Sequence, residues 1–125
     1  MRAFLDTHAA VFLFDGQTHL FGAAGRKLLS RAEIRYSPAV GLELALLHER
    51  GRLTVPPEEV LGFLGARLGV MKAADTLAEV VDRAMGLSWT RDPFDRMIAA
   101  HALLHEAPLI TRDRVLLANC PGAVW

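Results

Sequence analysis

The segment Thr90–Ala102 constrains this chain most, because a strong helix start coincides there with two acidic residues. Asp92 is a favourable N-cap, since its carboxylate can accept a backbone N–H of the first turn, and Pro93 suits the first helical position. Apolar residues follow Asp95 at spacings of three, four and seven, which predicts an inward-facing helix stripe with Asp95 at its head. A carboxylate on such a stripe is costly unless another group compensates it. The two acids are therefore either a capping pair alone or part of a functional site.

Strand and helix signals alternate along the rest of the chain. Short apolar runs that end at polar or turn residues are typical of buried parallel strands, and amphipathic stretches with Pro near their starts are typical of helices. The expected strands are 3–5, 33–37, 67–71, 108–111 and 123–125. The expected helices are 9–14, 22–31, 38–50, 56–66, 73–85, 93–102 and 115–118. In the helix 73–85, the residues expected to face inward are Leu77, Val80, Val81 and Ala84. This order predicts a single α/β domain over residues 1–125, with a parallel sheet flanked by helices on both faces.

Composition excludes some classes of protein. No apolar run is long enough for a membrane helix, and Asp6 interrupts the stretch where a signal peptide needs an apolar core. With the single Cys120, these features favour a cytoplasmic protein. The net charge of zero argues against a purely electrostatic nucleic-acid binder, although most of the 14 basic residues are Arg, which suits phosphate contacts.

Four acids from separate segments are expected to meet at one edge of the sheet. Asp6 and Asp113 follow predicted strands, Asp95 lies in a first helical turn, and Glu43 interrupts an apolar helix stripe. Asp6 and Asp113 could instead be helix caps, and Glu43 could lie at the solvent edge of its stripe. Clustered carboxylates raise one another's pKa unless a cation is bound, and hard oxygen ligands favour Mg²⁺ or Mn²⁺. Water activated by such a metal could hydrolyse a phosphodiester without a covalent nucleophile.

Four segments that span nearly the whole sequence form a recognisable pattern, and they are Leu5–His8, Val40–Ala45, Arg91–Ala100 and Leu109–Asp113. In these segments the chain resembles PIN-domain ribonucleases of the VapC toxin type. One departure is that Gly41 and Leu42 precede Glu43, where the family often has an aromatic residue.

The resemblance implies a PIN-like three-layer fold with a five-stranded parallel sheet and an Mg²⁺-dependent endoribonuclease activity inhibited by a cognate antitoxin. Carried over by position, the acidic metal-binding residues would be Asp6, Glu43, Asp95 and Asp113, and the polar neighbours would be Thr7, Asp92 and Thr111. The partners implied are an RNA substrate and an antitoxin protein. A small chain rich in apolar helix surface is also expected to form a homodimer.

Basic residues flank the acids in sequence. His8, Arg91, Arg96 and Arg112 are candidates for contacts with RNA phosphates, and Arg114 lies nearby. Ion pairing with the acids themselves is an equally open interpretation of the arginines. His101 and His105 have a zinc-like spacing but no third ligand in the pattern, and residues 22–27 lack the Gly-Lys-Ser/Thr ending of a phosphate-binding loop.

The interpretation that these features favour is a small metal-dependent endoribonuclease. The main alternative is a catalytically silent PIN-like module that binds RNA or protein. A phosphotransferase or response receiver would also place an acid after the first strand, but such proteins need a second early acid or a late Lys. In this chain Asp6 is followed by Thr7 and His8, and no Lys lies beyond Lys72.

Overall fold

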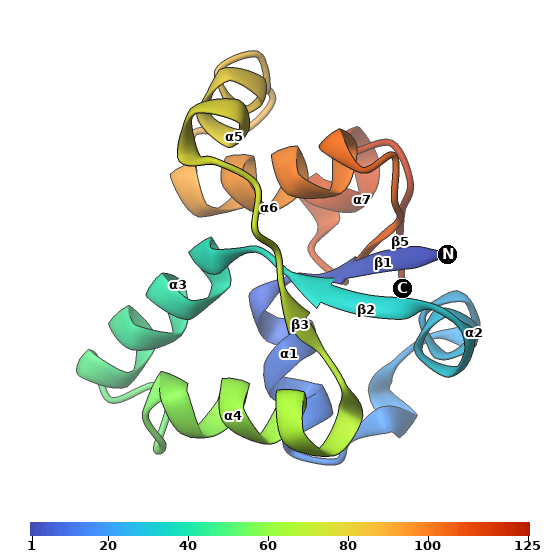
Figure 1. The fold of residues 1–125 in the computed structure, drawn as a ribbon, viewed down its shortest axis with the longest axis vertical. Coiled ribbons are helices and arrows are strands. Elements are labelled where there is room, and N and C mark those ends of the chain that lie inside the picture. Colours follow the sequence, from blue (N-terminus) through green and yellow to red (C-terminus); the bar gives the residue numbers. More distant parts are fainter.

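The computed structural model describes all 125 residues, which form a single five-stranded parallel sheet in the order β3-β2-β1-β4-β5 (Figure 1). The strands are β1 (Arg2–Leu5), β2 (Glu33–Tyr36), β3 (Met71–Lys72), β4 (Leu109–Ile110) and β5 (Ala123–Val124). The helices are α1 (Thr7–Phe14), α2 (Ala23–Arg31), α3 (Pro38–Glu49), α4 (Pro57–Leu68), α5 (Leu77–Ala84), α6 (Pro93–Leu104) and α7 (Arg114–Asn119), with a 3₁₀ turn at Thr18–Leu20. No helix combines the length and the apolar composition that crossing a lipid bilayer requires.

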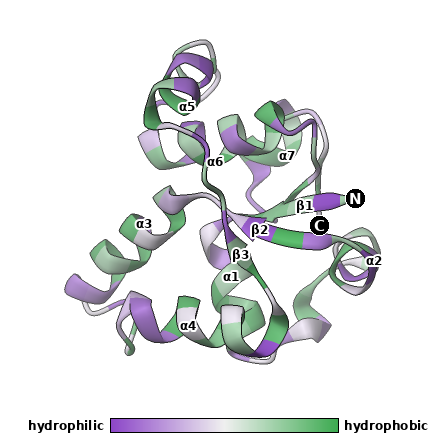
Figure 2. Cartoon of the chain, viewed as in Figure 1, coloured by the Kyte–Doolittle hydropathy of each residue, from purple (hydrophilic) through white to green (hydrophobic).

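The central strand β1 explains why the chain folds around its first residues. Ala3, Phe4 and Leu5 are fully buried, because β2 pairs with one side of the strand, β4 pairs with the other, and helices cover both faces. In Figure 1, α5, α6 and α7 lie on one side of the sheet and α1, α3 and α4 on the other. Figure 2 shows hydrophilic and hydrophobic residues alternating in β2, and hydrophilic residues where α3 ends and α4 begins. The expected α/β fold with helices on both faces is confirmed.

Helix α6 begins and packs as its sequence predicts. The Asp92 carboxylate accepts hydrogen bonds from the backbone N–H groups of Phe94 and Asp95, at 2.8 and 3.3 Å. Ile98 and Ala99 on the apolar stripe are buried in the main core. Helix α6 therefore carries Asp95 in its first turn at the border between core and solvent, where the side chain is half-buried.

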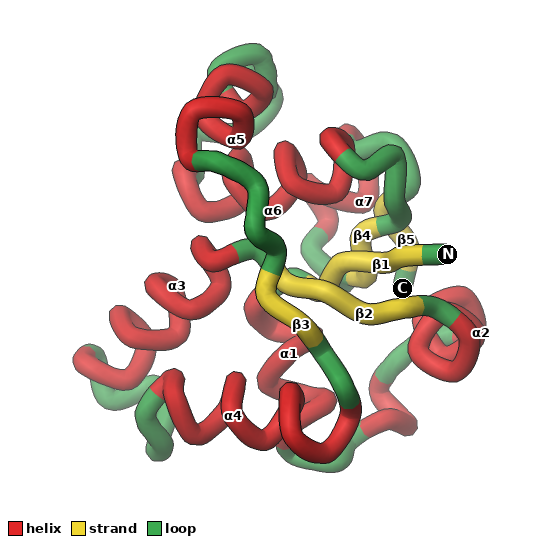
Figure 3. Tube along the Cα trace, viewed as in Figure 1, coloured by secondary structure: helices red, strands yellow, loops and turns green.

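The region around β3 differs from the sequence-based expectation. The expected strand at 67–71 is wrong, because α4 continues to Leu68 and only Met71–Lys72 pairs with β2. The expected helix at 73–85 begins only at Leu77, after an extended loop that Figure 3 shows between β3 and α5. Thr76 caps α5 in a reciprocal hydrogen-bonding arrangement with Glu79. This later start leaves Leu77 71% exposed and Val81 37% exposed, so their expected inward orientation is wrong as well.

The glycines of residues 22–27 have a packing role. A Cβ atom at Gly22 would lie 2.5 Å from the backbone oxygen of Trp125, so only glycine allows this close approach. The Trp125 ring stacks on Phe21 with a centroid separation of 4.6 Å. The segment therefore holds the C-terminal residue against α2, which accounts for its glycines without a bound nucleotide.

Candidate active site

Five carboxyl groups line one small cavity at the carboxyl edge of the sheet. The cavity has a volume of about 120 Å³, and its lining residues are Asp6, Thr7, His8, Glu43, Asp92, Asp95, Ile98 and Asp113. They come from the end of β1 and start of α1, from the middle of α3, from the start of α6, and from the loop after β4. Because β1 and β4 are parallel neighbours, the residues that follow them meet at the same edge. All four acids that the sequence analysis selected lie in this acidic pocket.

Asp6 and Asp113 are joined through the hydroxyl of Thr111. The Thr111 Oγ1 donates a hydrogen bond to Asp6 Oδ2 and accepts one from the backbone N–H of Asp113 at 3.0 Å. Thr111 is fully buried at the end of β4, and Asp6 is 6% exposed. One buried hydroxyl therefore fixes the relative positions of two acids that are distant in sequence.

Both of these acids are also helix caps. Asp6 Oδ1 accepts the backbone N–H of Ala9 at 2.8 Å, and Asp113 Oδ1 accepts those of Val115 and Leu116 at 2.9 and 3.0 Å. The capping interpretation is thus correct for both residues, but it does not exclude a functional one. In each case Oδ1 serves the helix, while the carboxyl group still lines the acidic pocket.

Glu43 is held by a hydrogen bond from a neighbouring helix. The hydroxyl of Thr7, which is 2% exposed at the start of α1, donates to Glu43 Oε1. This bond joins residues 36 positions apart and connects α1 to α3. The solvent-edge alternative for Glu43 is therefore wrong, because its carboxylate faces the pocket and has a buried partner.

Asp95 is the least compensated acid of the pocket. Its carboxyl group accepts no hydrogen bond from the protein, whereas the other four carboxylates each accept at least one. Burial raises the pKa of Asp95 to about 7, and the nearby charges of Asp92, Asp113, Glu43 and Asp6 add to the effect. Burial also raises the pKa of Asp6, against the opposing hydrogen bonds from Thr111 and Ala9.

The donor set suits a hard divalent cation. None of the five carboxylates forms an ion pair with an Arg or Lys side chain, so their mutual repulsion is unrelieved within the protein. Carboxylate oxygens are the ligands that Mg²⁺ and Mn²⁺ prefer. No three of these side chains are arranged so that they could hold a metal ion as they stand, so binding a cation would require some of them to move.

The basic residues selected from the sequence occupy different positions. His8 lines the pocket beside Asp6. Arg91 is exposed and donates to the carbonyl of Ser88 at 3.3 Å, and the Arg112 guanidinium lies 4.6 Å from the centre of the Phe12 ring. The exposed Arg114 is the first residue of α7. Phosphate contacts by His8, Arg91 and Arg112 stay predictions.

Arg96 connects two helices. Its guanidinium donates to the carbonyl oxygens of Thr90, Ala84 and Met85, at 2.8, 3.4 and 3.4 Å. Adjacent helix positions point about 100° apart, so Arg96 faces α5 while Asp95 faces the pocket. The phosphate contact predicted for Arg96 also stays a prediction.

Sequence analysis missed one residue beside the pocket. Arg50 lines a second cavity of about 290 Å³ that shares Glu43 and Asp92 with the acidic pocket. The available signal was spacing, because Arg50 is seven residues after Glu43 and therefore lies on the same helical face. A third, larger cavity of about 900 Å³ lies at the opposite edge of the sheet, near Pro108 and Gly122, and contains no acidic cluster.

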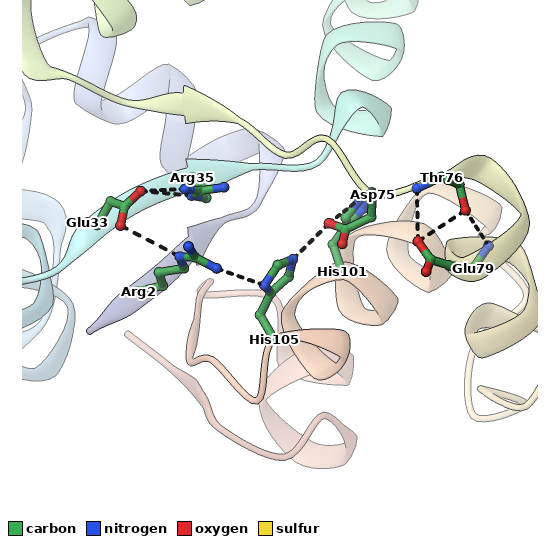
Figure 4. Close-up of polar contacts among 8 residues, drawn as sticks. All are labelled: Arg2, Glu33, Arg35, Asp75, Thr76, Glu79, His101 and His105. Atoms are coloured by element: carbon green, nitrogen blue, oxygen red, sulfur yellow. Dashed lines mark hydrogen bonds and ion pairs between the residues drawn. The ribbon is translucent and has the colours of Figure 1, made fainter.

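His101 and His105 are part of a separate polar network (Figure 4). His105 Nε2 lies 2.7 Å from Asp75 Oδ2, and His101 Nε2 lies 3.8 Å from the same oxygen. Asp75 belongs to the loop between β3 and α5, which the sequence analysis had assigned to a helix. The histidine spacing therefore reflects a contact between α6 and this loop.

Comparisons with known proteins agree with the fold. The model of the PIN domain family matches residues 3–120. The chain is 30% identical to Ribonuclease VapC22 of Mycobacterium tuberculosis over 128 aligned positions, which cover 97% of this chain and 96% of that protein.

Solved structures share the fold at lower sequence identity. The VapBC2 structure from Rickettsia felis, bound to a promoter DNA fragment, has a TM-score of 0.69 at 18% identity and covers 99% of this chain and 96% of the other. A toxin–antitoxin complex from Klebsiella pneumoniae has a TM-score of 0.67 at 20% identity, with 98% and 96% covered. With a family match over almost its entire length, and with acids from four segments gathered at the carboxyl edge of its sheet, this chain belongs to the PIN-domain family.

Proposed function

We propose that this protein is a metal-dependent endoribonuclease and the toxin of a toxin–antitoxin pair. The observation that carries the proposal is the acidic pocket, in which Asp6, Glu43, Asp95 and Asp113 face one another without a compensating Arg or Lys. The relative named as a ribonuclease supports the activity, and the structural neighbours described as VapBC and toxin–antitoxin complexes support the biological role.

The four acids would hold Mg²⁺ or Mn²⁺, with Asp95 offering the carboxylate that no protein group already engages. Such a cation, when bound, stabilises phosphoryl charge and lowers the pKa of water to generate the nucleophile. The remaining work belongs to the protein. Thr111 fixes Asp6 relative to Asp113, Thr7 fixes Glu43, and the Asp92 cap orients the turn that carries Asp95.

The proposed reaction needs no covalent nucleophile from the protein. The pocket contains no Ser, Cys or Lys side chain, and the Thr7 hydroxyl is already donated to Glu43. We propose water as the attacking group, and the leaving oxygen of the RNA departs with a proton from solvent or from an acid of the pocket. His8 at the pocket's edge is placed to contact a phosphate beside the scissile bond.

The decisive experiment compares the wild-type protein with Asp95→Asn on a labelled single-stranded RNA in Mg²⁺, in Mn²⁺ and in EDTA. We expect internal cleavage by the wild type with either metal, no cleavage in EDTA, and at least a hundredfold slower cleavage by Asp95→Asn. Asp82→Asn is the matched control, because Asp82 is an exposed acid of α5 outside the pocket. Cleavage that survives chelation, or equal rates for the wild type and Asp95→Asn, would favour the silent RNA- or protein-binding module.

Protein partners follow from the apolar surface that the fold leaves exposed. Leu42, Met71 and Met85, on α3, on β3 and after α5, are 59%, 54% and 65% exposed. We propose that a second copy and an antitoxin cover part of this surface. Light scattering should give a mass of two chains for the isolated protein, and a monomer at micromolar concentration would count against the dimer.

A further inference from the structure

We propose that the cavity beside the acidic pocket is a nucleotide subsite, in which one unpaired RNA base stacks against Phe94 while Arg50 binds the adjoining phosphate. The proposal deepens the ribonuclease function proposed above and rests on it. It assigns a binding role to Arg50 and Phe94, for which the sequence analysis gave none, and it makes unpaired RNA the preferred substrate class.

The first support is position and size. This cavity of about 290 Å³ lies between the second half of α3 and the first turn of α6. It shares Glu43 and Asp92 with the acidic pocket, so a strand whose scissile phosphate lies among the acids continues directly into it. Its volume is at the lower limit of small-molecule sites, which leaves room for one base but not for a base-paired segment.

The second support is the apolar wall. Leu46 and Leu47 contribute from α3, and Pro93 and Phe94 from α6, and none of the four is fully buried. Every other phenylalanine of the chain has an aromatic neighbour, whereas Phe94 has none. An aromatic ring that is accessible from an open cavity can stack on any base, because every base has a π-face. In a duplex this face is covered by neighbouring base pairs, so the base must be unpaired.

The third support is charge. Arg50 caps the C-terminal end of α3, and its exposed guanidinium forms no ion pair or hydrogen bond with the protein. The partial negative charge of a helix C-terminus repels phosphate, so an anion at this position requires a cation such as Arg50. Seven residues separate Arg50 from Glu43, which places the two side chains about 10 Å apart along one helix face. A phosphate next to the scissile one in an extended strand can reach that position.

The subsite also supplies what the acidic pocket lacks. Five carboxylates repel a polyanion, and Glu43 and Asp92 extend that repulsion into the second cavity. A bidentate contact from a guanidinium that has no partner in the protein offsets this repulsion and fixes the direction of the strand. Arg50 and Phe94 therefore contribute to substrate binding and positioning and not to the chemistry itself.

The test uses Arg50→Ala and Phe94→Leu on a single-stranded oligoribonucleotide with one cleavage site, in Mg²⁺. For Arg50→Ala we expect KM to rise about tenfold, as for the loss of one partly exposed charge-assisted contact, while kcat stays within about twofold. Arg50→Lys should recover part of the loss. Arg52→Ala is the matched control, because Arg52 is an equally exposed arginine in the following turn that does not line the cavity.

A second measurement identifies the base. Abasic nucleotides are placed singly on either side of the scissile bond, and binding is measured by fluorescence anisotropy in the Asp95→Asn background. One abasic position should weaken binding about tenfold with Phe94 present, and by less than twofold in Phe94→Leu, because the ring and the base act as a pair. A purely structural role for Phe94 would weaken the intact and abasic RNAs equally, and that result would overturn the proposal.

Failure of this proposal is distinguishable from failure of the proposed function. If the wild type cleaves RNA but Arg50→Ala behaves like Arg52→Ala, the ribonuclease stands and the subsite is wrong. If the wild type cleaves no RNA but binds it through Arg50 and Phe94, the subsite stands and the catalytic function is wrong. If both variants leave RNA binding unchanged but reduce the mass measured by light scattering, the cavity is a protein interface and the subsite is again wrong.

Discussion

The acidic pocket and the polar network of Figure 4 both contain carboxylate side chains, but the two regions differ in what surrounds those carboxylates. In the network, Glu33 is bonded to Arg35 at 2.6 Å and lies 3.6 Å from Arg2. Arg2 also donates to Nδ1 of His105 at 3.2 Å, which leaves the Nε2 proton of His105 for Asp75. Donors and acceptors alternate along this chain of contacts, so Glu33 and Asp75 each have a basic neighbour. In the pocket, by contrast, acids face acids.

The consequences for pKa are opposite in the two regions. The hydrogen bond from His105 lowers the pKa of Asp75, and that from Arg35 lowers the pKa of Glu33. In the pocket, burial and the neighbouring carboxylates raise the pKa of Asp95 to about 7. The contacts of the network therefore favour the charged forms of its acids, whereas burial and like charges in the pocket disfavour the charged form of Asp95. A charged cluster that the protein leaves unbalanced is the better candidate for function.

The largest difference between the two regions is expected in RNA cleavage, when one acid is removed from each region in turn. Asp6→Asn should reduce RNA cleavage at least a hundredfold, because it removes a carboxylate from the proposed metal site, while Asp75→Asn should leave kcat/KM within about twofold. Both are measured at 25 °C on folded protein, with circular dichroism as the check on folding. Equal losses for the two variants would mean that the acidic pocket has no special role.

A smaller effect is expected from the hydroxyl that joins two acids. Thr111→Val keeps the shape of the side chain but removes the hydrogen bonds to Asp6 and from Asp113. Loss of a group that orients metal ligands typically costs about 10–100-fold in metal affinity or activity. Titration with Mn²⁺ and cleavage rates should both show this loss. Thr54→Val, at an exposed threonine of the loop after α3, should show neither.

The third expectation concerns stability in EDTA. The folded-state pKa of Asp95 is about 7, above its ordinary 3.8, so its contribution to stability is complete below about pH 4 and is lost as the pH rises to 7. Asn at position 95 cannot ionise, so Asp95→Asn avoids the stability lost when the Asp95 carboxyl becomes charged. The variant should therefore stabilise the metal-free protein by about 1–2 kcal/mol above pH 7, after allowance for solvent screening of a half-exposed group. Urea unfolding at pH 4 and pH 8 measures the difference. A variant less stable than the wild type at pH 8 would contradict the repulsion inferred for the pocket.

The smallest effect is expected in the network, with the opposite sign. Asp75→Asn should lower the free energy of unfolding by about 1 kcal/mol at pH 7, since one partly exposed charge-assisted hydrogen bond is weakened. The lowered pKa of Asp75 means that its contribution is present above about pH 4 and is lost below it. Burial lowers the pKa of His101, so the wild type should also lose stability as the pH falls below 6.5. Urea midpoints from pH 3 to pH 8 test both trends.

Local signals in the sequence were sufficient for much of this structure. Asp92 and Pro93 mark the start of α6, the apolar run of β1 predicts its burial, and polar residues after β1 and β4 predict the edge where the acids meet. The start of α5 was also accessible in principle, because Thr76 and Glu79 form a capping box that the sequence shows. The two-residue strand β3 was not, because only its pairing with β2 defines it.

What sequence analysis could not supply is contact between distant segments. The bond between Arg2 and His105 spans 103 residues, and that between Asp75 and His105 spans 30, with no spacing rule to predict either. Arg96 shows that adjacency in sequence is not proximity in space, because its guanidinium contacts the end of α5 while its neighbour Asp95 lines the pocket. Arg50 was missed because its relation to the pocket depends on how α3 packs beside α6.

The double use of Asp6 and Asp113, each closing a helix while facing the pocket, has an evolutionary consequence. A descendant that lost catalysis would still need Asp, Asn, Ser or Thr at both positions to begin α1 and α7. Asp95 accepts no hydrogen bond, so it would drift first, and its replacement would even relieve strain between like charges. Degenerate copies of this protein should therefore be recognisable by an altered residue 95 between two retained helix caps.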